Sequence, residues 1–168
     1  MEGTDHFAKG TWKLIRSENF GQYCKYMGVS WVKRLLSSLI CPCQKIRVAS
    51  GHWSILTSSL LRETDVQFTE GKECTWLTYD GRNIRTSVVM ENGKLVLHQL
   101  DPPFAKITRE FDDQTMIMTL EVDGVKARRI YQKRDTAITD NKTINWSGIL
   151  LFMFVCLSTV SIAWYCQL

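Results

Sequence analysis

Two arginines and a tyrosine in the second half of the chain have side chains that could hold an anionic group. Arg129 and Tyr131 are two residues apart in a short strand-like segment, and Arg109 lies twenty residues before Arg129. In an extended strand, residues two apart point to the same face, so Arg129 and Tyr131 share a face with Val125 and Ala127. Because the opposite face is strongly basic, we expect Arg129 and Tyr131 to point inward.

Arg109 is also expected to point inward, because Ile107, Arg109 and Phe111 alternate with polar residues in their segment. An arginine keeps its proton in a protein, and burying an unpaired charge is very costly. Two inward arginines therefore require an anion or a dense water network. A ligand can supply that anion if the chain places no carboxylate there.

The composition is that of one folded domain with a modest positive charge. The chain has 168 residues, a net charge of +4 and 45% hydrophobic residues, which argues against disorder. The basic residues are scattered and form no nucleic-acid motif, so we expect no nucleic-acid partner. The chain has three histidines, and it lacks a Gly-x-Ser-x-Gly elbow, a phosphate-binding glycine loop and a carboxylate pair at catalytic spacing. We therefore expect no enzyme and no catalytic residues.

The six cysteines are irregularly spaced, and the polar N-terminus lacks a secretory signal. Both observations predict a reducing, cytosolic environment for the globular part. Cys41-Pro42-Cys43 is a close pair of thiols, but His52, His98 and Cys74 do not complete the spacing of a zinc finger. We expect free thiols, no metal and no other cofactor.

The first 135 residues have the pattern of a strand, a helix pair and then many strands. Residues 10–16 alternate as a strand with Trp12 and Leu14 on one face, and residues 17–38 have helical spacing, with Ser17 as N-cap and a break at Gly28. Pairs such as Asn92-Gly93 predict tight hairpins. The further strands are expected at residues 45–49, 52–59, 64–69, 73–78, 82–90, 94–100, 105–111, 115–122 and 125–133. Consecutive hairpins predict an antiparallel up-and-down β-barrel of about ten strands with an interior cavity.

The C-terminal segment is strongly apolar. Residues 148–166 contain no charged residue, and a helix of this length spans about 28 Å, close to the thickness of a membrane core. We therefore predict a barrel at residues 5–135, a polar linker at 136–146 and a transmembrane helix at 147–166. The alternative is a buried helix of the globular domain. The flanking positive charges predict a single-pass tail anchor with the barrel in the cytosol, in the endoplasmic reticulum or another secretory-pathway membrane.

Several motifs give the chain a family resemblance. The segment from Phe7 to Phe20 (FAKGTWKLIRSENF), Asp80-Gly81-Arg82, Ile107-Thr108-Arg109 and the terminal Arg129-Ile130-Tyr131 occur in order. Together they resemble the intracellular lipid-binding proteins, which include the fatty-acid-binding and retinoic-acid-binding proteins. The resemblance implies a ten-stranded, calycin-like and lipocalin-like barrel capped by a helix-turn-helix lid. It also implies that Arg109, Arg129 and Tyr131 hold a ligand carboxylate.

Two segments depart from the family pattern. Many members have a portal phenylalanine near residue 61, where this chain has Leu60-Leu61, and Asp101-Pro102-Pro103 replaces the usual Asp-Gly turn. These changes affect portal selectivity and one hairpin, not the anion site. The candidates for the portal and lid are Phe20, Tyr23 and Leu61, and those for membrane contact are Lys25, Lys33 and Arg34.

The favoured hypothesis is a monomeric, membrane-tethered carrier of long-chain fatty acids. A carrier of another hydrophobic carboxylate, such as retinoic acid, satisfies the same residues. A hypothesis of another class is a membrane-anchored interaction protein whose barrel binds no ligand. In that case internal carboxylates or water compensate Arg109 and Arg129, and the basic outer face meets a protein partner.

Overall fold

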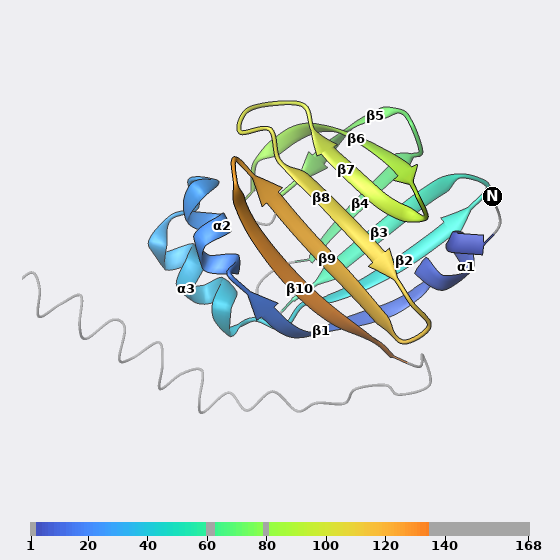
Figure 1. The fold of residues 1–168 in the computed structure, drawn as a ribbon, viewed down its shortest axis with the longest axis horizontal. Helices are drawn as coiled ribbons and strands as arrows, with labels where there is room; N and C mark the ends of the chain where they lie inside the picture. Colours follow the sequence, from blue (N-terminus) through green and yellow to red (C-terminus); the bar gives the residue numbers. More distant parts are fainter. Residues whose placement is uncertain (1–2, 60–62, 79–80, 135–168) are drawn as a thin grey trace, which may run out of the picture. The chain divides into compact units, whose positions relative to one another are not determined.

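Ten antiparallel strands form a single sheet that curls into a nearly closed barrel in the computed structural model, which describes residues 3–59, 63–78 and 81–134 (Figure 1). The strands are β1 (Gly10–Glu18), β2 (Cys43–Ala49), β3 (His52–Ser58), β4 (Glu63–Thr69), β5 (Glu73–Leu77), β6 (Asn83–Glu91), β7 (Lys94–Gln99), β8 (Lys106–Phe111), β9 (Thr115–Val122) and β10 (Val125–Arg134). The order in the sheet is β4-β3-β2-β1-β10-β9-β8-β7-β6-β5. Strands paired in the sheet are therefore neighbours in sequence except for β1 and β10, and the consecutive strands β4 and β5 form the two edges of the sheet. The predicted ten-stranded up-and-down meander is confirmed.

Tight turns between the strands use residues that tolerate a left-handed backbone. At the turn between β9 and β10, Asp123 and Gly124 have φ angles of 42° and 76°. Asn92 and Gly93, between β6 and β7, have φ angles of 50° and 75°. Positive φ at both central positions gives the turn the twist of the flanking strands, which keeps the hairpin in register.

A helix pair, α2 (Phe20–Tyr26) and α3 (Trp31–Leu39), covers one end of the barrel (Figure 1). Asn19 precedes α2 and donates a side-chain hydrogen bond of 2.8 Å to the carbonyl oxygen of Lys126 on β10. The hydroxyl of Tyr26 donates to the carboxylate of Asp123 at the β9–β10 turn. The lid is thus tied to the β9–β10 turn and to the adjoining start of β10.

The boundary between β1 and the lid differs from the sequence prediction. The strand continues to Glu18, and Ser17 pairs with Arg129 in the β1–β10 ladder instead of capping a helix. A bulge at Ile15 is the reason. Leu14 is opposite Tyr131 but Arg16 is opposite Ile130, so the inserted Ile15 shifts the alternation by one residue.

The end of the barrel opposite the lid is filled by aromatic side chains. Trp12 and Trp53 are almost fully buried, and the rings of Trp53 and Phe68 stack with their centroids 5.9 Å apart. A short helix that the sequence did not predict, α1 (Gly3–Ala8), lies at this end (Figure 1). The carbonyl oxygen of Ala8 accepts a 2.9 Å hydrogen bond from Trp12 Nε1. Packing therefore closes this end of the barrel.

The predicted linker (136–146) and transmembrane helix (147–166) lie outside the described residues, and so does Leu61. Within residues 3–59, 63–78 and 81–134, no helix is both long and apolar enough to cross a membrane. The carboxyl-terminal anchor stays a prediction from the sequence.

Candidate functional site

The strand register brings the two arginines and the tyrosine onto one wall of the barrel. Arg109 on β8 and Arg129 on β10 are each paired with Met118 of the intervening strand β9. Paired residues of antiparallel strands point to the same face, so both arginines project from one row, with their Cα atoms about 10 Å apart. Tyr131 follows Arg129 by one inward position and lies opposite Leu14 and Met116.

All three side chains line a cavity between this wall and the helical lid. The volume of this space is about 1220 Å³ when its open mouth is included. The part of it that the centre of a water molecule can occupy is about 200 Å³. Its walls are mainly apolar, and the larger apolar contributors are Phe20, Tyr23, Met27, Ile40, Trp76, Leu97, Ile107, Met118 and Leu120. A cavity with apolar walls and a small number of polar groups is typical of a site for a hydrophobic ligand.

Arg109 is buried and has donors without a partner. Its side chain is 3% exposed, and neither Nε nor Nη1 has a hydrogen-bond partner. Burial lowers the pKa of the guanidinium to about 10, which still leaves it charged at neutral pH. The guanidinium carbon lies 5.7 Å from the ring centroid of Trp76, and this contact compensates a small part of the charge. Arg109 is therefore a positive charge directed at the cavity.

Tyr131 is also fully buried, and its hydroxyl has no hydrogen-bond partner. Burial raises the pKa of this phenol, while the charges of Arg129 and Arg109 act in the opposite direction. The phenol keeps its proton at neutral pH and can donate a hydrogen bond. Tyr131 and Arg109 together present unpartnered donors to the same part of the cavity.

Arg129 has a different environment, because it lies beside the lid. It is only partly buried, and its Nε donates a 3.3 Å hydrogen bond to Ser17 Oγ. Its guanidinium carbon lies 4.2 Å from the ring centroid of Phe20 on α2. Arg129 thus connects the wall that carries Arg109 and Tyr131 to the lid, and a ligand would add to contacts that it already makes.

The lid residues Phe20 and Tyr23 both line the cavity, and their rings stack with centroids 6.2 Å apart. Burial raises the pKa of Tyr23 to about 12. Lys25 and Lys33 are exposed on the outer surface of the lid, and Lys33 also borders the cavity. The structure therefore places two of the three candidate portal residues at the cavity.

Arg34, which the sequence suggested for membrane contact, has an internal role as well. Its Nη1 donates a 2.7 Å hydrogen bond to the carbonyl oxygen of Val29. The backbone nitrogen of Val29 in turn donates to the carbonyl oxygen of Cys24 at 2.9 Å. Arg34 stabilises the turn between α2 and α3, so the shape of the lid depends on it.

The comparison with known families agrees with this geometry. Residues 9–134 match the model of the lipocalin / cytosolic fatty-acid binding protein family. The chain belongs to this family.

Similar proteins cover nearly all of the barrel. The sodium/calcium exchanger regulatory protein 1 of Doryteuthis pealeii is 37% identical over 126 residues, which are 75% of this chain and 96% of that protein. The fatty acid-binding protein 9 of Homo sapiens is 31% identical over 125 residues, with coverage of 74% and 95%. Among solved structures, a Schistosoma mansoni fatty acid binding protein in complex with arachidonic acid has a TM-score of 0.76 and 32% identity, covering 79% of this chain and all of that one. The REP1-NXSQ fatty acid transporter has a TM-score of 0.73 and 37% identity, with coverage of 76% and 96%.

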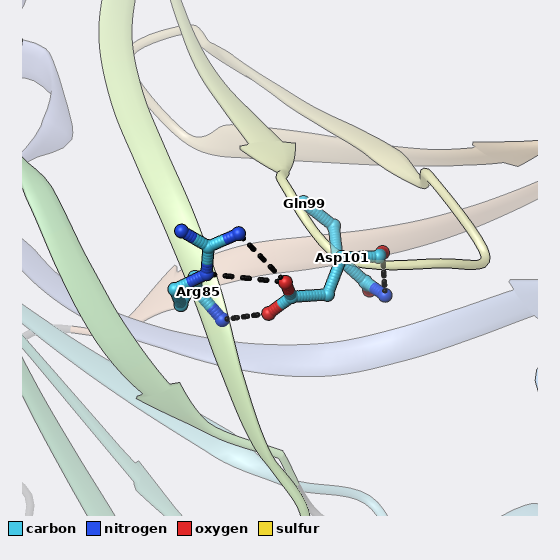
Figure 2. Close-up of polar contacts among 3 residues, drawn as sticks. All are labelled: Arg85, Gln99 and Asp101. Atoms are coloured by element: carbon cyan, nitrogen blue, oxygen red, sulfur yellow. Dashed lines mark hydrogen bonds and ion pairs between the residues drawn. The ribbon is translucent and has the colours of Figure 1, made fainter.

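At the Asp101-Pro102-Pro103 turn, which departs from the family pattern, the aspartate is held by a neighbouring strand. Figure 2 shows the carboxylate of Asp101 facing Arg85, and it accepts hydrogen bonds from the Arg85 backbone nitrogen (2.9 Å), Nε (3.1 Å) and Nη2 (3.0 Å). The backbone oxygen of Asp101 accepts a 2.8 Å hydrogen bond from Gln99 Nε2. The connection from β7 to β8 is thereby fastened to β6, and the amide nitrogen of Gln99, a cavity residue, is engaged.

Sequence reasoning missed Gln44 as a residue of the cavity and Ser17 as the hydrogen-bond partner of Arg129. Ser17 was assigned to a helix cap, and Gln44 fell just outside the strand predicted at 45–49. Extending that strand backwards by alternation from the buried Ile46 and Val48 places Gln44 on the inner face, so a signal for it existed. The bulge at Ile15 left no comparable signal for Ser17.

Proposed function

We propose that this protein binds long-chain fatty acids non-covalently inside its barrel and carries them between membranes. The ligand carboxylate lies against Arg109, Arg129 and Tyr131, and the acyl chain occupies the apolar part of the cavity. The observation that carries the proposal is the set of unpartnered donors on Arg109 and Tyr131 at the wall of an apolar cavity. A carboxylate supplies the negative charge and the acceptor oxygens that these donors need.

Membership of the family supports this assignment, as do relatives whose names specify fatty acids. The energetics agree. At about 0.8 kcal/mol per buried methylene, a sixteen-carbon chain gains on the order of 10 kcal/mol, from which ordering costs are subtracted. The carboxylate then fixes the orientation of the ligand, and affinities in the micromolar range or tighter follow.

Transfer requires the cavity to meet a membrane, and the lid has a suitable surface. Trp31, Val32 and Leu35 on α3 are exposed apolar side chains, with Trp31 68% exposed. Lys25 and Lys33 add positive charge on the same pair of helices, which favours anionic headgroups. We propose that a transmembrane helix at 147–166 keeps the monomeric barrel on the cytosolic side of an endoplasmic reticulum or related membrane.

The experiment uses delipidated full-length protein in lipid nanodiscs, offered a mixed lipid extract. Native mass spectrometry then identifies what stays bound, with empty nanodiscs as the blank. We expect long-chain fatty acids to be retained and Arg109→Gln to lose them. Arg128→Gln is the matched control, because it makes the same change at an arginine that is exposed on the outer face of β10.

Each outcome of this experiment separates the hypotheses. Retention of retinoic acid in preference to fatty acids would change the ligand but not the site. An empty wild-type barrel would support the scaffold hypothesis, in which Arg109→Gln leaves a protein partner bound. Carbonate extraction of the full-length protein tests the anchor, and release into the supernatant would remove it.

A further inference from the structure

Gln44 has an unpartnered polar atom that the carboxylate site does not use. Within the described residues, the buried side chains with unpartnered nitrogen or oxygen atoms are Arg109, Tyr131 and Gln44. Gln44 is 6% exposed, lines the cavity from β2 and leaves its Oε1 without a hydrogen bond. Arg109 and Tyr131 offer donors, whereas Gln44 offers an acceptor. One ionised carboxylate cannot satisfy both kinds of group, since it has no proton to donate.

Gln44 belongs to a polar row on the wall next to the carboxylate site. It is paired with Thr57 of β3, which is paired with Thr64 of β4, and all three side chains line the cavity. On its other side, Gln44 is paired with Trp12, which is also paired with Lys133 of β10. Gln44 therefore lies two strands away from Tyr131. Along the strand direction it is offset from Tyr131 by two residues, which is one inward-facing position. From strand spacings, the two Cα atoms are about 12 Å apart.

This separation places the amide close to the first carbons of a bound acyl chain. The Gln44 and Tyr131 side chains both extend into the cavity, so their polar ends are closer together than their Cα atoms. A ligand whose carboxylate contacts Tyr131 passes the amide within a few methylene groups. An unsubstituted methylene offers nothing to Oε1, and a buried acceptor without a partner weakens binding.

A hydroxyl group fits this position in either orientation of the amide. It donates to Oε1, and it can accept from Nε2 or from a threonine hydroxyl. We propose that Gln44, with Thr57 and Thr64, forms a second polar subsite that selects long-chain fatty acids with a hydroxyl group near the carboxylate. This inference rests on the proposed function and names a narrower class of ligand for the same cavity.

The test compares isomers that differ only in the position of the hydroxyl. Full-length protein in nanodiscs is titrated with palmitate, 3-hydroxypalmitate and 16-hydroxypalmitate, each in competition with a fluorescent fatty acid. We expect 3-hydroxypalmitate to bind about tenfold more tightly than 16-hydroxypalmitate, the difference that one buried hydrogen bond makes. The preference should disappear in Gln44→Met, which keeps a long unbranched side chain but has no amide.

Two controls keep the result specific. Gln132→Met makes the same change on the exposed outer face of β10 and should leave the preference intact. Palmitate binding by Gln44→Met shows that the variant is folded. If that variant does not fold, the comparison of the two isomers in the wild-type protein decides the matter.

The outcomes separate this inference from the proposed function. Equal affinities for the two isomers in the wild-type protein, or a preference that survives Gln44→Met, would overturn the hydroxyl subsite. Palmitate binding would then still support the fatty-acid site. Failure of all three acids to bind would overturn the proposed function itself.

Discussion

The surroundings of the two arginines differ more than their shared row in the sheet suggests. Arg109 is 3% exposed with two unpartnered donor atoms, whereas Arg129 is partly exposed and contacts Ser17 and Phe20. The protein gives Arg129 polar and aromatic contacts and partial access to solvent, whereas two donor atoms of Arg109 have no partner in the protein. Anion affinity should therefore depend mainly on Arg109, and Arg129 should mainly couple the ligand to the lid.

The largest expected effect is on affinity, and it separates the two arginines. Arg109→Gln should weaken palmitate binding about 100-fold, because it removes a desolvated charge, whereas Arg129→Gln should weaken it about tenfold. Competition titrations with a fluorescent fatty acid measure both. Equal losses at the two positions would show that the difference in burial has no functional consequence.

The next effect is on the stability of the ligand-free protein. Removing Arg109 should weaken ligand binding but stabilise the empty barrel. Arg109→Met should raise the free energy of unfolding by about 2 kcal/mol, because it removes a buried charge without a partner. Arg129→Met should leave it unchanged or lower it. Denaturant titrations of delipidated protein measure both, and a lower stability of Arg109→Met would contradict the assignment of Arg109 as uncompensated.

The same prediction has a pH dependence. Burial lowers the pKa of Arg109 in the folded protein to about 10, so above pH 10 the unfolded chain holds more protons than the folded one. The stabilisation by Arg109→Met should therefore be fully present below pH 10 and decrease as the pH rises above 10. The stability difference between variant and wild type, measured as a function of pH, cancels the titration of other groups.

A smaller effect is expected at the tyrosine. Tyr131→Phe removes one neutral hydrogen-bond donor and should weaken palmitate binding about fivefold. The apolar ring remains, so packing against Leu14 and Met116 should be kept. Calorimetric titration gives the affinity, and thermal unfolding checks the packing. An unchanged affinity would mean that the phenol does not contact the carboxylate.

The smallest effect is expected at Ser17. Ser17→Ala frees Arg129 Nε from its hydrogen bond and should change palmitate affinity less than about threefold. The dissociation rate is the sharper readout, because Arg129 is also in contact with Phe20 of the lid. Stopped-flow displacement should show faster release from Ser17→Ala. A dissociation rate equal to that of the wild type would show that the hydrogen bond of Ser17 does not affect release of the ligand past the lid.

Alternation in the sequence was sufficient to place Arg109, Arg129 and Tyr131 on the inner wall of the barrel. Arg109, Arg129 and Tyr131 lie in regular strands, where a period of two determines the face. Alternation was not sufficient to predict which of the two arginines is more deeply buried. The partial exposure of Arg129 depends on its position beside the lid, and the contact with Phe20 joins segments more than a hundred residues apart.

The misses have local physical causes. Ser17 has the residue type of a helix cap, and the bulge at Ile15 that keeps it in the strand has no signature in the sequence. The strand containing Gln44 was predicted to begin at residue 45, whereas it begins at Cys43. Helix α1 is only six residues long, and the hydrogen bond from Lys133 to the carbonyl oxygen of Phe7 joins it to a segment 126 residues away.

The bulge at Ile15 also decides which side chain of β1 lies opposite Arg129. In a regular β1 that residue would be Arg16, and two guanidinium groups would be direct cross-strand neighbours. The inserted residue turns Arg16 to the other face, where it forms a 2.8 Å ion pair with Glu18, and places the neutral hydroxyl of Ser17 opposite Arg129. One extra residue in a strand thus keeps a like charge away from Arg129.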